Sequence, residues 1–158
     1  NLSMQGMCFM QLGQEFQRSK MVATGEDGNY TEADVKRAMN SYNAPDKVNQ
    51  VDWDLLNERQ NSIDFVRKVI QLKTQTDAFS YPTYEEIYHH VFVHSANEHS
   101  GWIVYEVHGK EHLLVVFNAK GKPQRFENAG SLQLLVTNTT SLEEDILGDI
   151  SVSVFKVL

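Results

Sequence analysis

Apolar and polar residues follow different patterns in successive parts of the chain. Residues 4–12 are mostly apolar without a clear period, and the run ends at Gly13. Such a run is typical of a strand that is buried on both faces in a parallel sheet. A buried helix end would give the same pattern, because so short a run does not separate the two. In either case we expect Gly13 to mark the point where the backbone turns into a loop.

The next segment, residues 17–52, has little periodicity and is predicted to be a long loop. One short helix is expected inside it, because Thr31 precedes Glu32 and Asp34 in the manner of a capped helix start. Loops of this length are unusual inside compact domains and are commonly functional. In barrel enzymes, the loops that follow the strand ends build the active face.

A helix is predicted over residues 55–76. Its apolar residues recur at the spacing of a core-facing stripe with a second row beside it: Ile63, Val66 and Ile70, then Phe65, Val69 and Leu72. Residues 79–83 then connect this helix to the second half of the chain.

Beyond Tyr84 the apolar pattern changes to period two, which predicts strands. The expected strands are residues 87–94, 101–107, 113–118, 124–126, 132–136 and 150–157. Turn residues such as Gly109-Lys110 lie between them. An antiparallel β-sandwich is the architecture that this pattern favours.

Composition narrows the classes of partner. With 158 residues, of which 41% are hydrophobic, the chain can form one ordinary domain or two small units that share a core. A net charge of -7 argues against nucleic acid and anionic membranes, which both require a basic surface. No apolar run approaches the roughly 18 residues of a membrane span. We expect a soluble protein and leave its compartment open, with the cytoplasm favoured over secretion.

Cys8 is the single cysteine of the chain, so an intramolecular disulfide is excluded. Because it lies in an apolar run, we expect a buried thiol.

Residues 40–53 combine four amides, two carboxylates, a tyrosine and a tryptophan. Amides and carboxylates hydrogen-bond to hydroxyl groups, and flat aromatic faces pack on sugar rings, so this loop is a candidate sugar contact. The alternative is a plain polar loop in which Trp53 is buried and Pro45-Asp46 only makes a turn.

Three motifs of this region resemble type I pullulanases, which are debranching enzymes of the alpha-amylase superfamily (glycoside hydrolase family thirteen). They are Gln11-Leu12-Gly13-Gln14-Glu15-Phe16, the loop Asn40-Ser41-Tyr42-Asn43-Ala44-Pro45-Asp46, and Asn49-Gln50-Val51-Asp52-Trp53 downstream of it. The resemblance covers residues 6–79 by motif and residues 84–158 by pattern alone.

The resemblance implies an α+β fragment: the last strand, loop and helix of a (β/α)8 barrel in residues 1–82, and an antiparallel all-β carboxyl-terminal domain in residues 83–158. A complete barrel takes about 250 residues, so this chain is too short to hold one. In this family the catalytic carboxylates lie on earlier barrel strands. We therefore expect the chain alone to be inactive, and its unpaired edge at residues 7–12 to favour self-association.

The implied function is that of the carboxyl-terminal part of a debranching hydrolase that cleaves α-1,6-glucosidic bonds in pullulan, glycogen or starch. An α-1,4-acting hydrolase of the same superfamily and an autonomous carbohydrate-binding sandwich remain as alternatives. The expected partners are an α-glucan and the remainder of the barrel, with neither nucleic acid nor membrane. No organic cofactor is expected, and calcium in the intact parent is left open.

The resemblance places four residues beside the glucan cleft: Tyr42, Asn43, Asp46 and Asn49. Tyr42 would stack on a sugar ring and the others would bond to hydroxyl groups, although each could instead hold the loop in shape.

Six other polar residues have expected supporting roles. Asn40, Gln50 and Asp52 are predicted to hold the loop by bonds from their side chains to the backbone. Gln14, Glu15 and Arg18 are predicted to form a polar frame at the end of the strand.

All six histidines lie in the second half of the chain. His90 and His94 would share a strand face about 13 Å apart, which is too far to chelate one ion. His108 and His112 flank a turn, but with a single cysteine the chain lacks the ligands of a closed structural zinc site, so no metal site is predicted. In the same half, Trp102 and Tyr105 could form an aromatic platform for starch, but aromatic residues on strands more often pack in a core.

Overall fold

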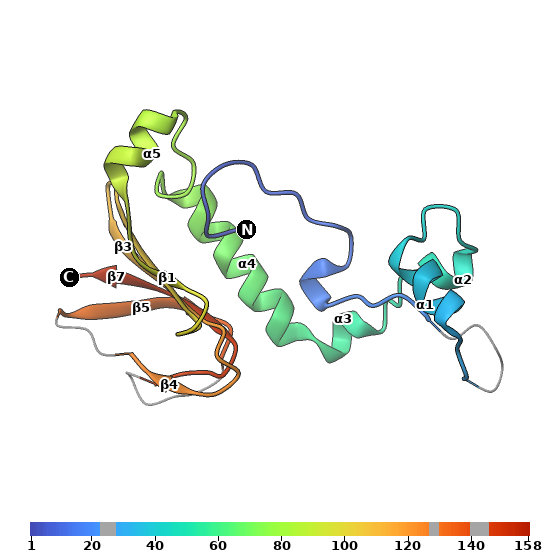
Figure 1. Ribbon diagram of the computed structural model, residues 1–158. Coiled ribbons are helices and arrows are strands. Elements are labelled where there is room, and N and C mark those ends of the chain that lie inside the picture. Colours follow the sequence, from blue (N-terminus) through green and yellow to red (C-terminus); the bar gives the residue numbers. More distant parts are fainter. Residues whose placement is uncertain (23–27, 127–129, 140–145) are drawn as a thin grey trace. The chain divides into compact units, whose positions relative to one another are not determined.

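Five antiparallel strands form the centre of the larger of two units into which the chain divides (Figure 1). The computed structural model describes residues 1–22, 28–126, 130–139 and 146–158. The larger unit comprises residues 1–9 and 64–158, and the smaller one comprises residues 10–63.

The strands of the main sheet lie in the order β1-β2-β3-β7-β5. They are β1 (Val91–Asn97), β2 (Trp102–His108), β3 (His112–Asn118), β7 (Ser151–Val157) and β5 (Leu132–Thr137). Two short strands, β4 (Gln124–Arg125) and β6 (Ile146–Leu147), pair in a second sheet. The antiparallel β-structure predicted for this half is therefore confirmed.

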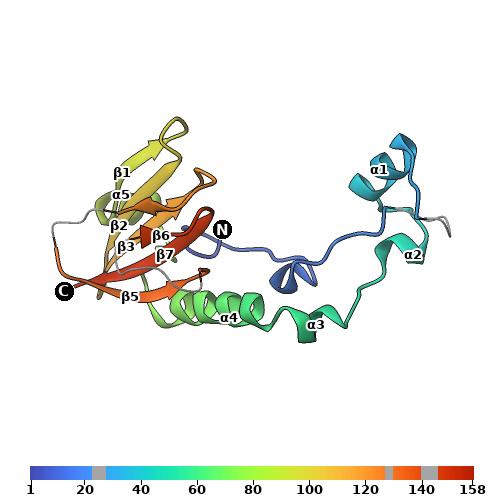
Figure 2. The same ribbon diagram turned by 90° about the horizontal axis from the view of Figure 1, so that it is seen from below.

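Each face of the main sheet carries its own apolar cluster. On one face, strand residues such as Val107 and Val115 pack against Val69 of helix α4 (Gln60–Gln75), and Figures 1 and 2 both show this helix beside the sheet. On the other face, Val116 packs in a cluster that includes Leu147 of β6. The sandwich is thus asymmetric, with a five-stranded sheet covered by a helix on one side and by the two-stranded sheet on the other.

The first residues of the chain are tied into this larger unit. The Tyr105 hydroxyl donates to the carbonyl of Ser3, and Gln5 bonds through its side chain to the backbone of Ala78 and Tyr81. Cys8 is only partly buried, so the prediction of a buried thiol holds in part.

The strand predicted over residues 4–12 is not formed. The segment consists of turns and irregular backbone, and most of its large apolar side chains are exposed, including Met7 (89%) and Phe9 (82%). A strand needs at least one neighbouring strand to bond to its backbone, and a strand inside a barrel needs one on each side. Since none of the described strands pairs with this segment, its apolar residues have no sheet to enter.

A second correction concerns residues 87–90, which were predicted to begin a strand in an all-β domain. They belong to helix α5 (Tyr84–His90), and β1 begins only at Val91. The Thr83 side chain accepts from the backbone N–H of Glu86, which is a helix cap. The cap and the acids of the first turn outweigh the alternating pattern.

The two helix predictions of the first half are confirmed. Thr31 and Asp34 form a reciprocal capping box at the start of α1 (Glu32–Met39). The long helix is present as α3 (Leu55–Glu58) followed by α4. No helix in the described ranges is both long and apolar enough to cross a membrane.

The smaller unit has only a small core. It contains the 3-10 helix η1 (Gln14–Phe16), then α1, α2 (Asp46–Asn49) and α3. Phe16 and Val48 are fully buried, and the Trp53 ring lies 6.2 Å from that of Phe16. Trp53 remains 55% exposed, so it covers this core rather than filling it.

Candidate functional site

The Asn49 side chain forms hydrogen bonds across the predicted sugar-contact loop. Its amide nitrogen donates to the carbonyls of Ser41 (2.8 Å) and Ala44 (3.3 Å), and its Oδ1 accepts from the Ser41 hydroxyl at 2.7 Å. Both amide hydrogens and the carbonyl oxygen are therefore engaged within the loop. Of the two roles open to Asn49, the structure supports that of holding the loop in shape.

Two cations from the preceding segment hold the same loop. Arg18 donates to the carbonyl of Asn49 and, at 3.3 Å, to that of Leu12, while Lys20 donates to the Ser41 hydroxyl. Arg18 therefore links the backbone before η1 to the end of α2. Of the predicted polar frame, Arg18 forms bonds to the backbone, and Gln14 accepts from the backbone N–H of Gln11 at 3.2 Å.

Gly13 is required where this link begins. Its φ is +89°, and a Cβ there would lie 2.7 Å from the Arg18 side chain. The prediction that the backbone turns at Gly13 is confirmed, and the close approach of Arg18 adds a second reason for glycine.

The loop exposes the three other predicted contact residues. Tyr42 is 86% exposed, and Asn43 and Asp46 are also exposed. The structure thus brings Tyr42, Asn43 and Asp46 together on one short segment whose shape is fixed by Asn49. An exposed phenol ring beside an amide and a carboxylate can stack on a sugar ring and hydrogen-bond to its hydroxyl groups.

Asp52 has the supporting role predicted for it. Its Oδ1 accepts from the backbone N–H of Asp54 at 3.0 Å, just before α3. The structure therefore assigns this carboxylate a local hydrogen bond that orders the connection between the loop and the helix.

Trp102 and Tyr105 do not form an aromatic platform but pack against the two faces of the sheet, as was favoured for aromatic residues on strands. Tyr105 is 7% exposed and packs in the cluster that α4 covers, whereas Trp102 packs against the cluster on the opposite face. The two residues are three apart on β2, so their side chains point to opposite faces.

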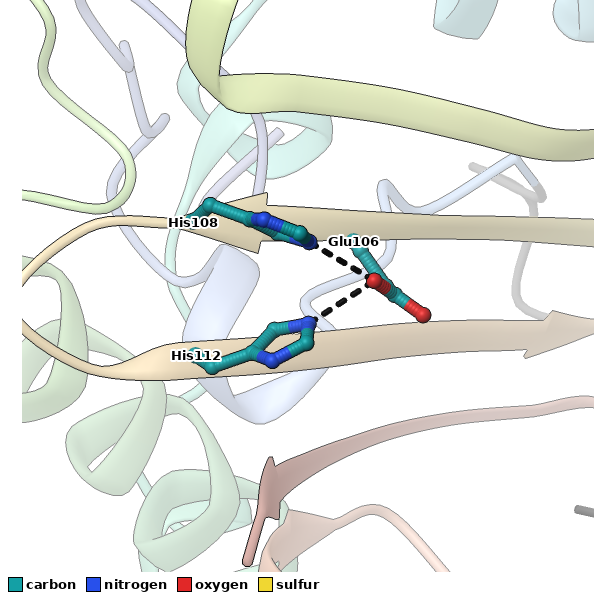
Figure 3. A group of neighbouring side chains, drawn as sticks. All are labelled: Glu106, His108 and His112. Atoms are coloured by element: carbon teal, nitrogen blue, oxygen red, sulfur yellow. Dashed lines mark hydrogen bonds and ion pairs between the residues drawn. The ribbon is translucent and has the colours of Figure 1, made fainter. Parts of the chain in front are cut away.

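Three histidines do converge, around Glu106 of β2. The Nε2 atoms of His108 and His112 each lie 2.8 Å from Glu106 Oε2, and His94 Nε2 lies 3.1 Å from Oε1. Figure 3 shows the imidazoles of His108 and His112 both directed at the same carboxylate oxygen. This set is the one group of potential metal ligands found among the described residues, with His108, His112 and Glu106 as its members.

The imidazoles control the ionisation of Glu106. Partial burial alone would raise the pKa of this carboxyl, but the hydrogen bonds from His108 and His112 and the charges of His112 and His94 outweigh it and lower the pKa to about 2. Glu106 is therefore a carboxylate throughout the physiological range.

This cluster was not predicted from the sequence, because Glu106 was not considered beside His108 and His112 at their turn. His90 is on α5, where its ring stacks on Tyr81 at 4.7 Å, and not on a strand beside His94. The useful signal was the alternation Glu106-x-His108 before a short turn, which places His112 directly across from His108.

An open groove of about 650 Å³ lies elsewhere in the larger unit. Its lining mixes polar, charged and aliphatic residues: Lys68, Gln71, Leu72, Gln75, Thr76, Asp77, Lys110, Glu111, Leu135 and Val136. Since none of these residues is aromatic, the groove lacks the flat apolar faces that favour a sugar ring.

Comparisons with known proteins agree with the motifs. No family model matches the chain. A pullulanase of Bacillus subtilis (strain 168) is 29% identical over 95 residues, which are 60% of this chain and 11% of that protein.

Solved structures match over nearly the whole chain. The pullulanase of Anoxybacillus sp. LM18-11 complexed with maltotetraose superposes with a TM-score of 0.73 at 24% identity, covering 98% of this chain and 22% of the other. Apo pullulanase from Paenibacillus barengoltzii gives 0.71 at 25% identity over 99% of this chain and 23% of that one. The catalytic module of the glycogen-degrading pneumococcal virulence factor SpuA, in complex with an inhibitor, gives 0.74 at 21% identity, with coverages of 99% and 30%.

The chain spans about a tenth of the curated relative and less than a third of each of these solved structures. Within that limited span, it is similar in sequence and in fold to the pullulanases of glycoside hydrolase family thirteen, as the motifs predicted.

Proposed function

We propose that this chain is the carboxyl-terminal portion of a debranching glycoside hydrolase that cleaves α-1,6-glucosidic bonds in pullulan, glycogen or starch. The observation that carries the proposal is the match of 98% of the chain to about a fifth of a pullulanase. The three motifs around the loop support it independently, because they are short sequence features rather than general fold properties.

In the intact enzyme, residues 1–82 complete the barrel and residues 83–158 form the domain that follows it. The exposed apolar residues Met7, Phe9 and Leu12 support this assignment. As a barrel strand they would be buried between parallel neighbours supplied by the rest of the parent. The same segment that is irregular here would then become the last strand of a closed sheet.

The loop held by Asn49 lines one side of the glucan cleft. Tyr42 provides the stacking surface, and Asn43 and Asp46 bond to sugar hydroxyl groups. This division of roles follows from the bonds within the loop, because the side-chain amide of Asn49 already bonds to Ser41 and Ala44, whereas the other three side chains are exposed.

Hydrolysis of the glycosidic bond is carried out by residues in the rest of the parent enzyme. A retaining hydrolase needs two carboxylates, one as nucleophile and one as acid and base, held about 5 Å apart across the scissile bond. By the family resemblance these groups lie on earlier barrel strands, so this chain shapes the cleft and does not itself cleave.

Two measurements test the proposal together. The reading frame upstream of the codon for Asn1 is expected to continue through barrel strands that carry the catalytic carboxylates, and the encoded protein is expected to release maltotriose from pullulan. The chain of residues 1–158 incubated alone with pullulan is expected to release nothing. A start codon close to Asn1, or hydrolysis by the isolated chain, would overturn the proposal.

A further inference from the structure

We propose that Glu106, His108 and His112 form a binding site for a divalent transition-metal ion of the Zn²⁺ class. The site lies in the larger unit and does not depend on the proposed role in glucan hydrolysis. Two imidazole nitrogens and one carboxylate oxygen are ligands that Zn²⁺ accepts readily, whereas Ca²⁺ and Mg²⁺ require sets of oxygen atoms.

The register of the sheet brings the ligands together. His108 and His112 are direct partners at the β2–β3 turn, and Glu106 precedes His108 by two residues on the same strand. Alternation along a strand therefore puts all three side chains on one face. The convergence results from the backbone pairing of a well-defined hairpin rather than from long flexible side chains.

The distances are close to those of a coordination sphere. All three ligand atoms lie within 4.8 Å of one another, and both imidazole nitrogens are 2.8 Å from the carboxylate oxygen. Bonds of about 2.1 Å in a tetrahedral arrangement separate ligand atoms by roughly 3.4 Å. Both nitrogens must therefore move away from the oxygen by roughly 0.6 Å, which these partly exposed side chains can do by rotation.

Neighbouring residues hold the ligands in position. Phe92 packs against the His108 ring with centroids 4.6 Å apart. His94 lies at a register irregularity of β1, where its Nε2 contacts the other oxygen of Glu106 and leaves Oε2 facing the two imidazoles. Bulges commonly re-aim a side chain in this way, and partners of this kind strengthen metal sites.

Titration calorimetry with ZnCl₂ tests the site on the 158-residue chain purified without a polyhistidine tag. We expect saturable binding of one equivalent, and a rise in the thermal midpoint with Zn²⁺ but not with Mg²⁺, because an ion that binds only the folded state stabilises it. Co²⁺ in place of Zn²⁺ should give a visible absorption band that reports its coordination by nitrogen and oxygen.

His108→Ala and His112→Ala should each weaken Zn²⁺ binding by about tenfold or more, since each removes one of three ligands. His99→Ala is the matched control, because His99 is exposed and lies outside the cluster, and it should leave binding unchanged. Circular dichroism establishes that each variant is folded. Absence of one-equivalent binding, or equal binding by the His108, His112 and His99 variants, would overturn the proposal and leave a purely hydrogen-bonded cluster.

Discussion

At the scale of single residues, Asn49 is the clearest case of a side chain with a structural task. Asn49→Ala removes three hydrogen bonds within the loop and leaves partly buried carbonyls without donors. We expect a loss of about 1–3 kcal/mol in the free energy of unfolding, measured by urea titration. Asn43→Ala, in the same loop but exposed, should change it by less than about 0.5 kcal/mol. Equal effects of the two substitutions would contradict the assigned role.

Tyr42 is expected to act on the substrate rather than on stability. In the intact parent, Tyr42→Ala should raise KM for pullulan about fivefold, which corresponds to roughly 1 kcal/mol of lost stacking. Tyr30→Ala is the control, because Tyr30 is also an exposed tyrosine of the smaller unit. If both substitutions change KM alike, the loop does not contact the glucan.

Because of Tyr105, the free energy of unfolding is expected to depend on pH in the alkaline range. Burial raises the pKa of the Tyr105 phenol from 10.0 to about 12. Between these values the unfolded chain has lost the phenol proton that the folded chain retains, so stability falls as the pH rises from 10 to 12. The loss approaches about 2–3 kcal/mol.

Urea unfolding of the native protein and of Tyr105→Phe checks this expectation. Below pH 10 the variant should be less stable by about 1 kcal/mol, because it lacks the hydroxyl that bonds to Ser3. This difference should shrink or reverse near pH 12. A constant difference across the range would show that Tyr105 does not titrate with folding.

Residue chemistry in the loop was predictable from sequence only in part. The content of residues 40–53 predicted a polar loop, and the structure adds the short helix α2 inside it. The amide and aromatic content could not separate Asn49 from Asn43, because that distinction depends on which carbonyls the fold brings within reach. Glu106 was missed for a related reason: its partners are determined by the register of β2 against β3.

At the scale of elements, the Thr83 cap favours a helix over residues 84–90, where the alternating pattern predicted the start of a strand. Thr83-Tyr84-Glu85-Glu86 is the same type of signal as the start of α1, and in both cases the threonine side chain caps the helix. Thr83→Ala should lower the free energy of unfolding by about 1 kcal/mol. Thr83→Ser keeps the hydroxyl and should therefore retain most of the native free energy of unfolding. An equal decrease in the free energy of unfolding in both variants would exclude the cap as the cause.

The elements also show why the apolar pattern predicted the hairpin of β2 and β3 correctly but failed for residues 4–12. Residues 102–108 and 112–118 were predicted within a residue of their observed bounds, because their pairing partners are in the same chain. Residues 4–12 have the composition of a buried strand but no partners in the described sheets. An apolar run predicts a buried strand only when the neighbours that bury it are present.

At the scale of the whole molecule, the exposed apolar side chains of residues 4–12 favour self-association of the isolated chain. Met7 and Phe9 are 89% and 82% exposed, and large apolar side chains that remain in water favour contact with another apolar surface. The mass of the isolated chain measured by light scattering should therefore rise with protein concentration. Met7→Ser combined with Phe9→Ser should reduce the rise, whereas Tyr84→Ser, which removes an aromatic ring of similar exposure from α5, should not. A monomeric mass at every concentration would mean that residues 4–12 do not associate, and would weaken their assignment as a strand that the parent enzyme buries.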